Sequence, residues 1–522
     1  MKKRLLFICT CLFVVLIFCT AAQAAPKVMV DYRTVTFDVD PVIENGTTLV
    51  PLRAIFEMMG ANVTWDANTA TATAKKDDTT VILPIGSLTA TINEQPCQLA
   101  VPAKIIDNRT LAPLRFVGEA FGAEVIWNNE NQSIEITTLK SDDIPDAAKK
   151  PETWEKVIGT EGKYDATCIR QTRDGNYIIT GSKDKDIYLV ELDLTGEIQW
   201  EKTYGGDQAD YGACVQETLD GGYIITGQTC SNGAGYGDVF LIKTDANGNK
   251  QWEKTFGRSG DDFGSYVQQT ADGGYMIVGT LEPGGAGTLF RELWLIKTDN
   301  DGNCEWDKSF GDNRLFRGWS GLQTNDGGYI LAGDTSDDYM WGIYVVKVDD
   351  KGNKEWNAFY TGPDMDSVSE IKQTNDGGYA LVGYNTDGSH VSGFDLNMIK
   401  IDETGKLKWQ RSYEGSRTDD YTMGQSLVQL ADDSYILVGE EESMASSSLS
   451  DQAVLFKVNK NGDLQWSRAF SNEFDQGFKC VQLTYDGGLI IAGNRSPHGD
   501  YKTGSIYIVK TDIDGKINTN TK

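Results

Sequence analysis

Histidine is almost absent from this chain, which has 2 His among 522 residues. A copper or zinc site with three imidazoles therefore cannot be built within one chain. Basic residues are scarce too, because 48 Lys and Arg face 76 Asp and Glu, for a formal net charge of −28. Phosphate binding needs clustered Lys and Arg, so this balance argues against a nucleic-acid partner. We predict no metal and no cofactor.

Long hydrophobic runs are confined to the first 24 residues. A basic start at 2–4 precedes an apolar run over 5–19, and Ala-Gln-Ala at 22–24 has the form of a cleavage site. This pattern predicts a secretory signal peptide over 1–24. No later stretch approaches the ~20 apolar residues that span a bilayer. We therefore expect a secreted protein, extracellular or associated with the cell envelope, with no transmembrane span in its mature form.

Cysteine is sparse once the predicted signal is removed. No CxxC pair occurs, which argues against a Cys-based zinc site, and the spacing is not typical of a disulfide framework. Three of the cysteines stand at one register in repeated units, and we expect these to be buried free thiols. The six cysteines that follow the signal are Cys97, Cys168, Cys214, Cys230, Cys304 and Cys480.

Residues 28–138 contain an internal duplication. The sequence LVPLR at 49–53 returns as LAPLR at 111–115, and Trp65 returns as Trp127. Both repeats are offset by 62 residues. The two copies together predict a small α+β module.

Each copy of this module predicts one short helix, at 52–59 and at 114–121. Apolar residues at helical spacing give each helix one buried face. Gly60 and Gly122 follow the helices as C-caps. Short strands are expected after the first of these glycines.

These paired motifs resemble the copper amine oxidase N-terminal-like domain, sometimes called a stalk domain. The resemblance covers 25–139 and implies a spacer or attachment module of exported envelope proteins of Gram-positive-type bacteria. It implies no oxidase, because amine oxidases carry three copper-binding His in a separate C-terminal domain, and this chain has only His390 and His498. We expect Arg53 and Arg115, which are equivalent in the two copies, to form a structural ion pair or a helix contact.

A polar linker at 140–153 separates this module from seven copies of one unit at 154–522. The linker contains two Pro and has no apolar periodicity, which indicates a boundary. Each unit holds four short apolar segments separated by an Asp-Gly-like turn, a variable loop and an Asp-x-x-Gly turn. Such units of about 50 residues predict the blades of a β-propeller. The tryptophan that marks each unit recurs as Trp154, Trp200, Trp252, Trp306, Trp356, Trp409 and Trp466.

The two ends of this array complement each other. The last unit lacks its Trp segment, and Trp154 lacks the three segments that should precede it. We predict that the Trp154 strand completes the unit at 479–512 and closes a seven-bladed ring, which removes exposed sheet edges. The predicted fold class is mainly β, with a seven-bladed propeller after a small α+β module.

The Asp-x-x-Gly-x-x-x-Trp consensus, as at 402–409, resembles the tryptophan-docking motif of quinoprotein-type propellers. This resemblance implies a role in packing neighbouring blades. The Gly-His and Trp-Asp signature of WD repeats is absent, and so are the paired adjacent Cys of the quinoprotein dehydrogenases.

One face of the predicted propeller carries loops that differ in every unit, whereas the turns on the other face are uniform. Variable loops on a rigid scaffold are where binding usually resides. Aromatic rings with carboxylates can stack sugars or anchor a protein partner. The alternative is that the rings pack beneath the loops. The predicted ligand-binding residues are Tyr236, Phe290, Trp319, Trp341, His390, Tyr421, Tyr501, Asp210, Asp262 and Asp366.

The sequence favours an exported, non-catalytic binding or scaffold protein that binds an extracellular protein or a glycan, such as a cell-wall polymer. No catalytic residue is predicted. The alternative is an extracellular polysaccharide hydrolase or lyase that uses carboxylates at the channel mouth, which for hydrolysis must lie roughly 5–10 Å apart. The acids of the loop face fit that role, a role in attracting a cation, or simple turn capping. A quinone oxidoreductase ranks third, because no quinone site is recognisable.

Overall fold

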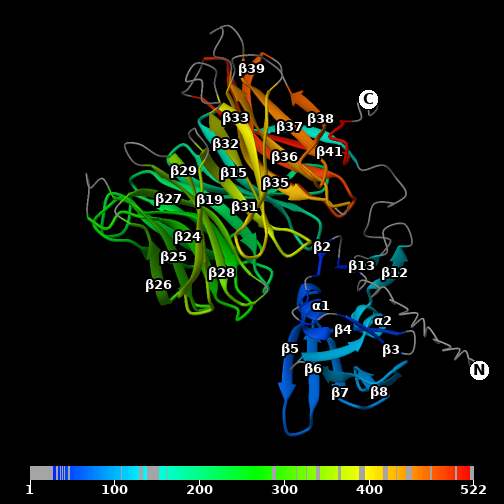
Figure 1. The fold of residues 1–522 in the computed structure, drawn as a ribbon. Coiled ribbons are helices and arrows are strands. Elements are labelled where there is room, and N and C mark those ends of the chain that lie inside the picture. The colour runs from blue at the N-terminus through cyan, green and yellow to red at the C-terminus, as the bar shows by residue number, and fades with distance from the viewer. Residues whose placement is uncertain are drawn as a thin grey trace, which may run out of the picture.

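The computed structural model describes most of residues 27–137 and 152–517 (Figure 1). The predicted signal peptide and most of the predicted linker lie outside the described residues. Within the two ranges, the residues left out are 31–32, 36, 38, 40, 45–46, 107–108, 129–132, 160, 285–289, 313, 325, 337–340, 362–365, 387–393, 416–420, 431, 443–449, 471–472 and 500–502.

The N-terminal module, blue to cyan in Figure 1, consists of short strands around two helices. Its strands form two four-stranded sheets, in the orders β12-β13-β1-β2 and β10-β11-β4-β3, and a five-stranded sheet from β5 to β9. The elements are β1 (Lys27–Val30), β2 (Arg33–Thr34), β3 (Val42–Glu44), β4 (Thr47–Pro51), α1 (Leu52–Met58), β5 (Asn62–Asp66), β6 (Thr71–Lys76), β7 (Thr79–Pro84), β8 (Thr89–Ile92), β9 (Gln95–Gln98), β10 (Lys104–Ile106), β11 (Arg109–Pro113), α2 (Leu114–Glu119), β12 (Glu124–Asn128) and β13 (Ser133–Thr137).

The two predicted helices are confirmed as α1 and α2. Leu52, Ile55 and Phe56 of α1 are buried in the core of the module, as their helical spacing predicts. Gly60 and Gly122 follow the helices with φ of 82° and 81°. This left-handed conformation suits glycine, and each helix ends within two residues of the predicted position.

The described part of 154–511 forms seven four-stranded antiparallel sheets. One sheet combines strands from both ends of the range, and the other six use consecutive strands. The strands, sheet by sheet, are β14 (Trp154–Ile158), β39 (Phe474–Leu483), β40 (Leu489–Pro497) and β41 (Ser505–Thr511); β15 (Tyr164–Gln171), β16 (Tyr177–Lys183), β17 (Asp186–Leu192) and β18 (Ile198–Tyr204); β19 (Asp210–Glu217), β20 (Tyr223–Thr229), β21 (Asp238–Thr244) and β22 (Lys250–Phe256); β23 (Phe263–Gln269), β24 (Tyr275–Leu281), β25 (Glu292–Thr298) and β26 (Cys304–Phe310); β27 (Leu315–Gln323), β28 (Tyr329–Ser336), β29 (Trp341–Val348) and β30 (Lys354–Tyr360); β31 (Asp366–Gln373), β32 (Tyr379–Thr386), β33 (Phe394–Ile401) and β34 (Leu407–Tyr413); and β35 (Tyr421–Gln429), β36 (Tyr435–Glu442), β37 (Gln452–Val458) and β38 (Leu464–Phe470).

The innermost strand of each sheet contacts the innermost strand of the next. These contacts run through β15, β19, β23, β27, β31, β35 and β39, and β39 contacts β15 again. The seven strands therefore surround a central axis, and the sheets radiate from it as a propeller-like array. The mainly β fold class predicted from the repeats is confirmed.

The array is closed by a strand from its own beginning. β14 pairs with β41 in antiparallel fashion, from Trp154 opposite Lys510 to Ile158 opposite Ile506. This is the pairing that the two incomplete ends of the repeat predict. It gives the last sheet its fourth strand and leaves that sheet like the other six.

Each repeated tryptophan lies against a glycine of the neighbouring sheet. A Cβ on Gly302, for example, would stand 2.6 Å from the Trp252 ring, and one on Gly405 would stand 2.6 Å from the Trp356 ring. The glycines have positive φ, and any side chain would enter the space of the ring. The seven pairs are Trp154 with Gly196, Trp200 with Gly248, Trp252 with Gly302, Trp306 with Gly352, Trp356 with Gly405, Trp409 with Gly462, and Trp466 with Gly515.

The predicted buried thiols are also present. Cys168, Cys214 and Cys480 are buried on the inner strands β15, β19 and β39 and are free. Each lies with its Sγ 3.6–3.8 Å from a backbone carbonyl of the next inner strand. The thiols therefore fill small gaps between sheets.

The tryptophan contact can be tested by two glycine substitutions of similar backbone conformation. Gly302 and Gly273 have φ of 74° and 89°, but a Cβ on Gly273 meets no atom within 4 Å. Gly273→Ala should cost about 1–2 kcal/mol for the left-handed backbone alone. Gly302→Ala should cost about 1–3 kcal/mol more, because the methyl group displaces Trp252. Urea unfolding followed by tryptophan fluorescence measures both, and equal losses would contradict the docking contact.

Candidate functional site on the loop face

The two ends of the sheets differ in chemistry. At the turn end, the first hairpin of a sheet is closed by a Thr hydroxyl that donates to the turn Asp, as Thr172 donates to Asp174 and Thr374 to Asp376. A buried Lys of the third strand pairs with the same Asp in several sheets, as Lys400 does with Asp376 at 2.9 Å. At the other end lie the connections between second and third strands and those between sheets. We call this end the loop face.

Among the described residues, the three most exposed aromatic side chains of the loop face are Tyr236, Phe290 and Tyr211. Tyr236 is 69% exposed, Phe290 48% and Tyr211 47%. They belong to two neighbouring sheets, β19–β22 and β23–β26. The amide N–H of Tyr236 donates to the carbonyl of Gly260 at 3.0 Å, which fastens its loop to the connection that leads to the next sheet. We call these three residues the exposed aromatic set.

Two other predicted aromatic residues face inward. The indole Nε1–H of Trp319 donates to Asp334 at 2.9 Å, and its ring lies 5.9 Å from that of Phe263. Tyr421 packs against Phe394 with ring centroids 4.7 Å apart. Burial raises the pKa of Asp334, and the bonds from Trp319 and Ser367 offset this. Both rings are half-buried and pack against neighbouring side chains.

The predicted carboxylates Asp210 and Asp262 are completely buried. Asp210 accepts bonds from the Gly206 amide at 2.9 Å and from Ser231 Oγ at 2.8 Å. Asp262 accepts bonds from the amides of Arg258 and Glu282, both at 2.6 Å. These two carboxylates hold the loop backbones in place and are not presented to a ligand at the surface.

The remaining predicted site residues cannot be placed by their side chains. Trp341 and Asp366 begin strands β29 and β31, and only their backbones are described. His390 and Tyr501 lie outside the described residues.

A pocket opens where the sheet that contains β39 meets the sheet that begins with β15. No single sequence motif indicated it. Its volume is about 330 Å³, and its wall includes Asp165 of β15, Glu440 of β36 and Asn494 of β40. Asn494 donates from Nδ2 to Asp165, and Lys479 donates to both oxygens of Glu440 at 2.9 Å. We call it the mouth pocket.

The pKa values of two carboxylates in the mouth pocket, Asp165 and Asp475, are shifted in opposite directions. Burial raises the pKa of Asp165, and Lys479 and Asn494 offset this only in part. Burial also opposes ionisation of Asp475, but bonds from His498 and from the Gly499 amide outweigh it and hold the pKa of Asp475 below its usual value. The pocket therefore holds carboxylates with different tendencies to be charged at one pH.

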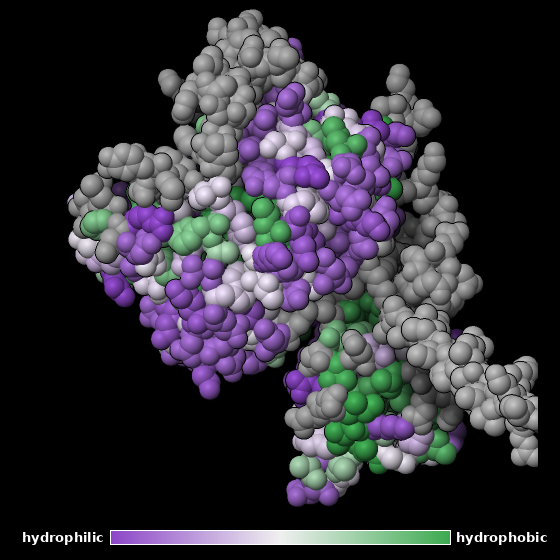
Figure 2. Space-filling model, in the orientation of Figure 1, coloured by the Kyte–Doolittle hydropathy of each residue, from purple (hydrophilic) through white to green (hydrophobic). Residues whose placement is uncertain are grey.

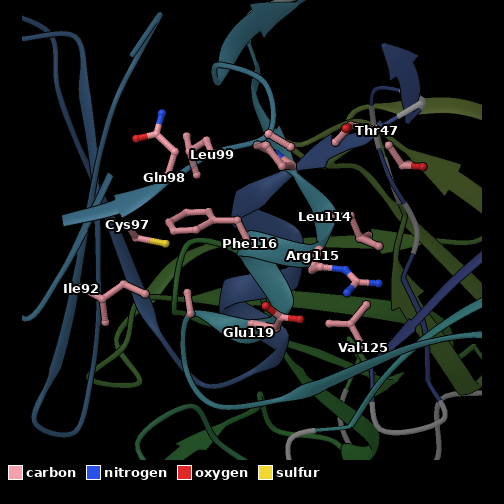
Figure 3. A pocket seen from close by; sticks show the side chains of 14 residues that line it. Thr47, Ile92, Cys97, Gln98, Leu99, Leu114, Arg115, Phe116, Glu119 and Val125 are labelled. Carbon is pink, nitrogen blue, oxygen red and sulfur yellow. The ribbon is translucent and has the colours of Figure 1, made fainter. Parts of the chain in front are cut away.

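A second cavity, of about 620 Å³, lies in the N-terminal module (Figure 3). Its wall is mostly apolar, with Leu99 and Phe116 among its residues, and Arg115 and Glu119 of α2 line it as well. Figure 2 shows apolar surface gathered over this module, whereas the array presents mainly hydrophilic surface in that view.

The duplicated arginines of the module have different environments. Arg53 Nη1 lies 3.5 Å from Glu57 Oε1, one helical turn later, as the predicted ion pair requires. Arg115 has no ion pair with any described residue and lies beside the cavity. The prediction is confirmed for the first copy and not for the second.

Residues 29–136 match the family model of the copper amine oxidase N-terminal domain. The match falls within the module and agrees with the resemblance carried by its paired motifs. It covers neither the array nor any of the predicted ligand-binding residues.

Several solved structures are similar to this chain at low identity. An ulvan lyase, a polysaccharide lyase bound to GlcA(1-4)Rha3S, shares 11% identity with a TM-score of 0.49 and covers 69% of this chain and 96% of its own. A protein of unknown function from Bacteroides caccae shares 10% with a TM-score of 0.36, over 61% and 94%. Drosophila Plexin A, solved with Semaphorin 1b, shares 7% with a TM-score of 0.38, over 70% and 88%. With TM-scores below 0.5, these similarities carry no functional argument.

Neither a metal cluster nor a membrane-spanning helix occurs among the described residues. No group of three or more His, Cys, Asp or Glu side chains is placed to hold a metal ion in this part of the chain. No helix in the same residues is long and apolar enough to cross a membrane.

The raised pKa of Asp165 gives a pH dependence of known sign. The pKa of Asp165 in the folded state lies above its unfolded value of about 3.9. Its ionisation therefore lowers the free energy of unfolding as the pH rises from the unfolded pKa through the folded pKa. Asp165→Asn keeps an oxygen that can accept the Asn494 bond and removes the charge. The free energy of unfolding of this variant, relative to the wild type, should therefore rise between pH 3 and pH 7, as measured by urea denaturation.

Asp402→Asn is the control of opposite sign. A bond from the Thr404 hydroxyl, aided by the Lys406 amide, lowers the pKa of Asp402 to about 2. This stabilisation is present above about pH 3.9 and is lost as pH falls toward 2. The control variant should lose stability at pH 7, and a pH-independent difference for Asp165→Asn would contradict the assignment.

Proposed function

We propose that this chain is an exported, non-catalytic binding protein of the bacterial cell envelope. The seven sheets are the blades of a propeller, and the loop face binds an extracellular protein or a glycan such as a cell-wall polymer. The N-terminal module serves as a stalk that attaches or spaces the propeller. Export is supported by the basic start, apolar run and cleavage site of residues 1–24.

The observation that carries this proposal is the exposed aromatic set. Tyr211, Tyr236 and Phe290 present large rings to solvent on two adjacent sheets of one face. Exposed rings on a rigid scaffold suit stacking on sugars or anchoring of a partner, since little conformational entropy is lost on binding. The predicted carboxylates of the same two sheets, Asp210 and Asp262, are committed to the loops. Within these two sheets, the rings of the exposed aromatic set lie at the surface, whereas Asp210 and Asp262 lie in the interior.

Binding by this face should depend on the exposed rings. Insoluble peptidoglycan, a glycan array and an extracellular protein library provide the probes for the full chain. The double variant Tyr236→Ala/Phe290→Ala should lower affinity for the captured probe about 30-fold or more, since each anchor contributes on the order of 2 kcal/mol. Leu219→Ala is the control, because Leu219 is 54% exposed at the turn end. Equal losses in both variants, or capture of no probe, would overturn the proposal.

A specific observation favours the second candidate, a polysaccharide hydrolase or lyase. Asp165, whose pKa is raised by burial, and Glu440 line the same mouth pocket. Glycoside hydrolysis uses a carboxyl group of raised pKa together with a second carboxylate. Lys479 neutralises Glu440 at 2.9 Å, and this pairing makes binding the better-supported reading of the face.

This alternative has its own test. The full chain is incubated with a panel of extracellular polysaccharides, and chain cleavage is followed by reducing ends and by ultraviolet absorbance of unsaturated products. The binding proposal predicts no cleavage above background. Cleavage that is lost in Asp165→Asn but retained in the aromatic double variant would establish the enzyme instead.

A further inference from the structure

The seven inner strands share an irregularity at the same register. Each has a β-bulge near its middle, for example between Ala166 and Cys168 in β15 and between Val368 and Glu370 in β31. The same shift occurs in β19, β23, β27, β35 and β39. Because side chains alternate along a strand, an equal register places equivalent residues at one height around the axis.

One such height forms a ring of side chains that line the central channel. They stand two residues after the end of each bulge, and all seven are half-buried, whereas their N-terminal neighbours are buried. Because these strands are the innermost of the array, the seven half-buried side chains lie beside its central axis. We call them the channel ring: Arg170, Gln216, Gln268, Leu322, Lys372, Val428 and Gln482.

Arg170 in this ring has no carboxylate partner among the described residues. Its Nη1 donates to the Ile169 carbonyl at 2.9 Å and lies 3.0 Å from Cys480 Sγ. Its Nε and Nη2 groups have no bond to the described protein. A guanidinium carries five donors in a fixed fork, so most of its capacity is open to the channel.

The second cation of the ring, Lys372, is paired with a single carboxylate. Lys372 Nζ lies 2.6 Å from Glu370 Oε1. The other oxygen of Glu370 is already occupied, because it accepts bonds from Ser426 Oγ at 2.8 Å and from the Leu427 amide at 3.0 Å. Burial opposes the charge of Lys372, but Glu370 outweighs it and raises the pKa of Lys372. Two cations and one anion thus remain charged together.

Charges on different inner strands act on one another at this height. The positive charge of Arg170 on β15 favours the charged form of Glu370 on β31 and opposes that of Lys372. Tyr266 of β23 lies within the same field and receives a bond from Gln216 Nε2 at 3.3 Å. At this height the described charged groups are therefore two cations and one anion, in a chain whose formal charge is −28.

We propose that the channel ring is a binding site for an oxyanion group, held by the Arg170 fork and attracted by Lys372. A carboxylate, sulfate or phosphate group fits the parallel donors of a guanidinium, and the amides of Gln216, Gln268 and Gln482 can donate to further oxygens. The site lies on the axis and is separate from the exposed aromatic set. It does not depend on what the loop face binds.

The chain itself supplies the test variant. Gln stands at the register of Arg170 in three other sheets, so Arg170→Gln places an accommodated side chain in the ring. The control is Arg411→Gln: Arg411 also donates Nη1 to the preceding carbonyl at 2.9 Å and has no carboxylate partner among the described residues, but it lies on the exterior. Arg170→Lys keeps the charge without the fork.

The measurement is thermal unfolding of the full chain at pH 7 and fixed ionic strength, titrated with acetate, sulfate or phosphate against chloride. We expect a saturable rise in Tm with at least one oxyanion for the wild type and for Arg411→Gln. Arg170→Gln should bind it at least about tenfold more weakly, and Arg170→Lys should fall between. The oxyanion that gives the response identifies the group.

The outcomes separate this site from the loop face. The variant Tyr236→Ala/Phe290→Ala should retain the full oxyanion response, even if it loses its partner. A rise in Tm that is equal in all variants reflects a general salt effect and overturns the proposal. So does a response to chloride equal to that of the oxyanions, or the absence of any saturable response.

Discussion

A tryptophan ring seated against a glycine of the next sheet fixes how each sheet meets its neighbour. The contact requires a flat ring on the outermost strand and a backbone that no side chain covers, and the chain supplies both seven times. With the spacing between sheets set in this way, the inner strands share one register around the axis. The turn end is equally constrained by its Thr–Asp bonds. Variation is left to the loop face, where the exposed aromatic set lies.

Much of this architecture could be predicted because it depends on repeated local chemistry. The helices α1 and α2 follow from apolar spacing and from Gly60 and Gly122, which end them within two residues of the predicted positions. The pairing of β14 with β41 follows from two incomplete repeats that complete each other. Packing of the tryptophans between sheets follows from their regular return. In each case a short sequence pattern is enough to predict the contacts that its residues make.

The orientations of the side chains in the candidate site were less predictable, because they depend on contacts between segments that are distant in sequence. Asp210 and Asp262 look like surface acids in sequence, but Asp210 begins the inner strand β19, Asp262 directly precedes β23, and both accept bonds from loop amides. Trp319 reads as a loop aromatic, yet it bonds to Asp334 of the adjacent strand. Tyr236 and Phe290 have similar sequence surroundings and remain exposed. The sequence of the loops therefore indicates which kinds of groups occur on the face, but it does not indicate which of their side chains point to solvent.

The channel ring shows the same limit. Arg170 follows an ordinary alternation of polar and apolar residues, and nothing nearby distinguishes it from a surface arginine. The position of Arg170 depends on the β-bulge. The bulge shifts the alternation of side chains along β15 and thereby places Arg170 beside the axis. A bulge leaves almost no trace in one sequence, although seven aligned strands make it visible. Glu370 and Lys372 lie on either side of Ile371 in sequence. Arg170 acts on their charges only because the closed ring brings β15 and β31 around one axis.

Closure by β14 also decides how the array would respond to mechanical load. The strand is the first described segment after the predicted linker, and it is held by five paired residues of β41 and by the Trp154 indole, which donates to the Leu194 carbonyl at 3.1 Å. Tension applied to the polypeptide before residue 154 reaches this strand first. Detaching it would expose the edge of β41 and free the Gly196 turn together. The strand that completes the circle is thus the point where a pulled molecule would begin to yield.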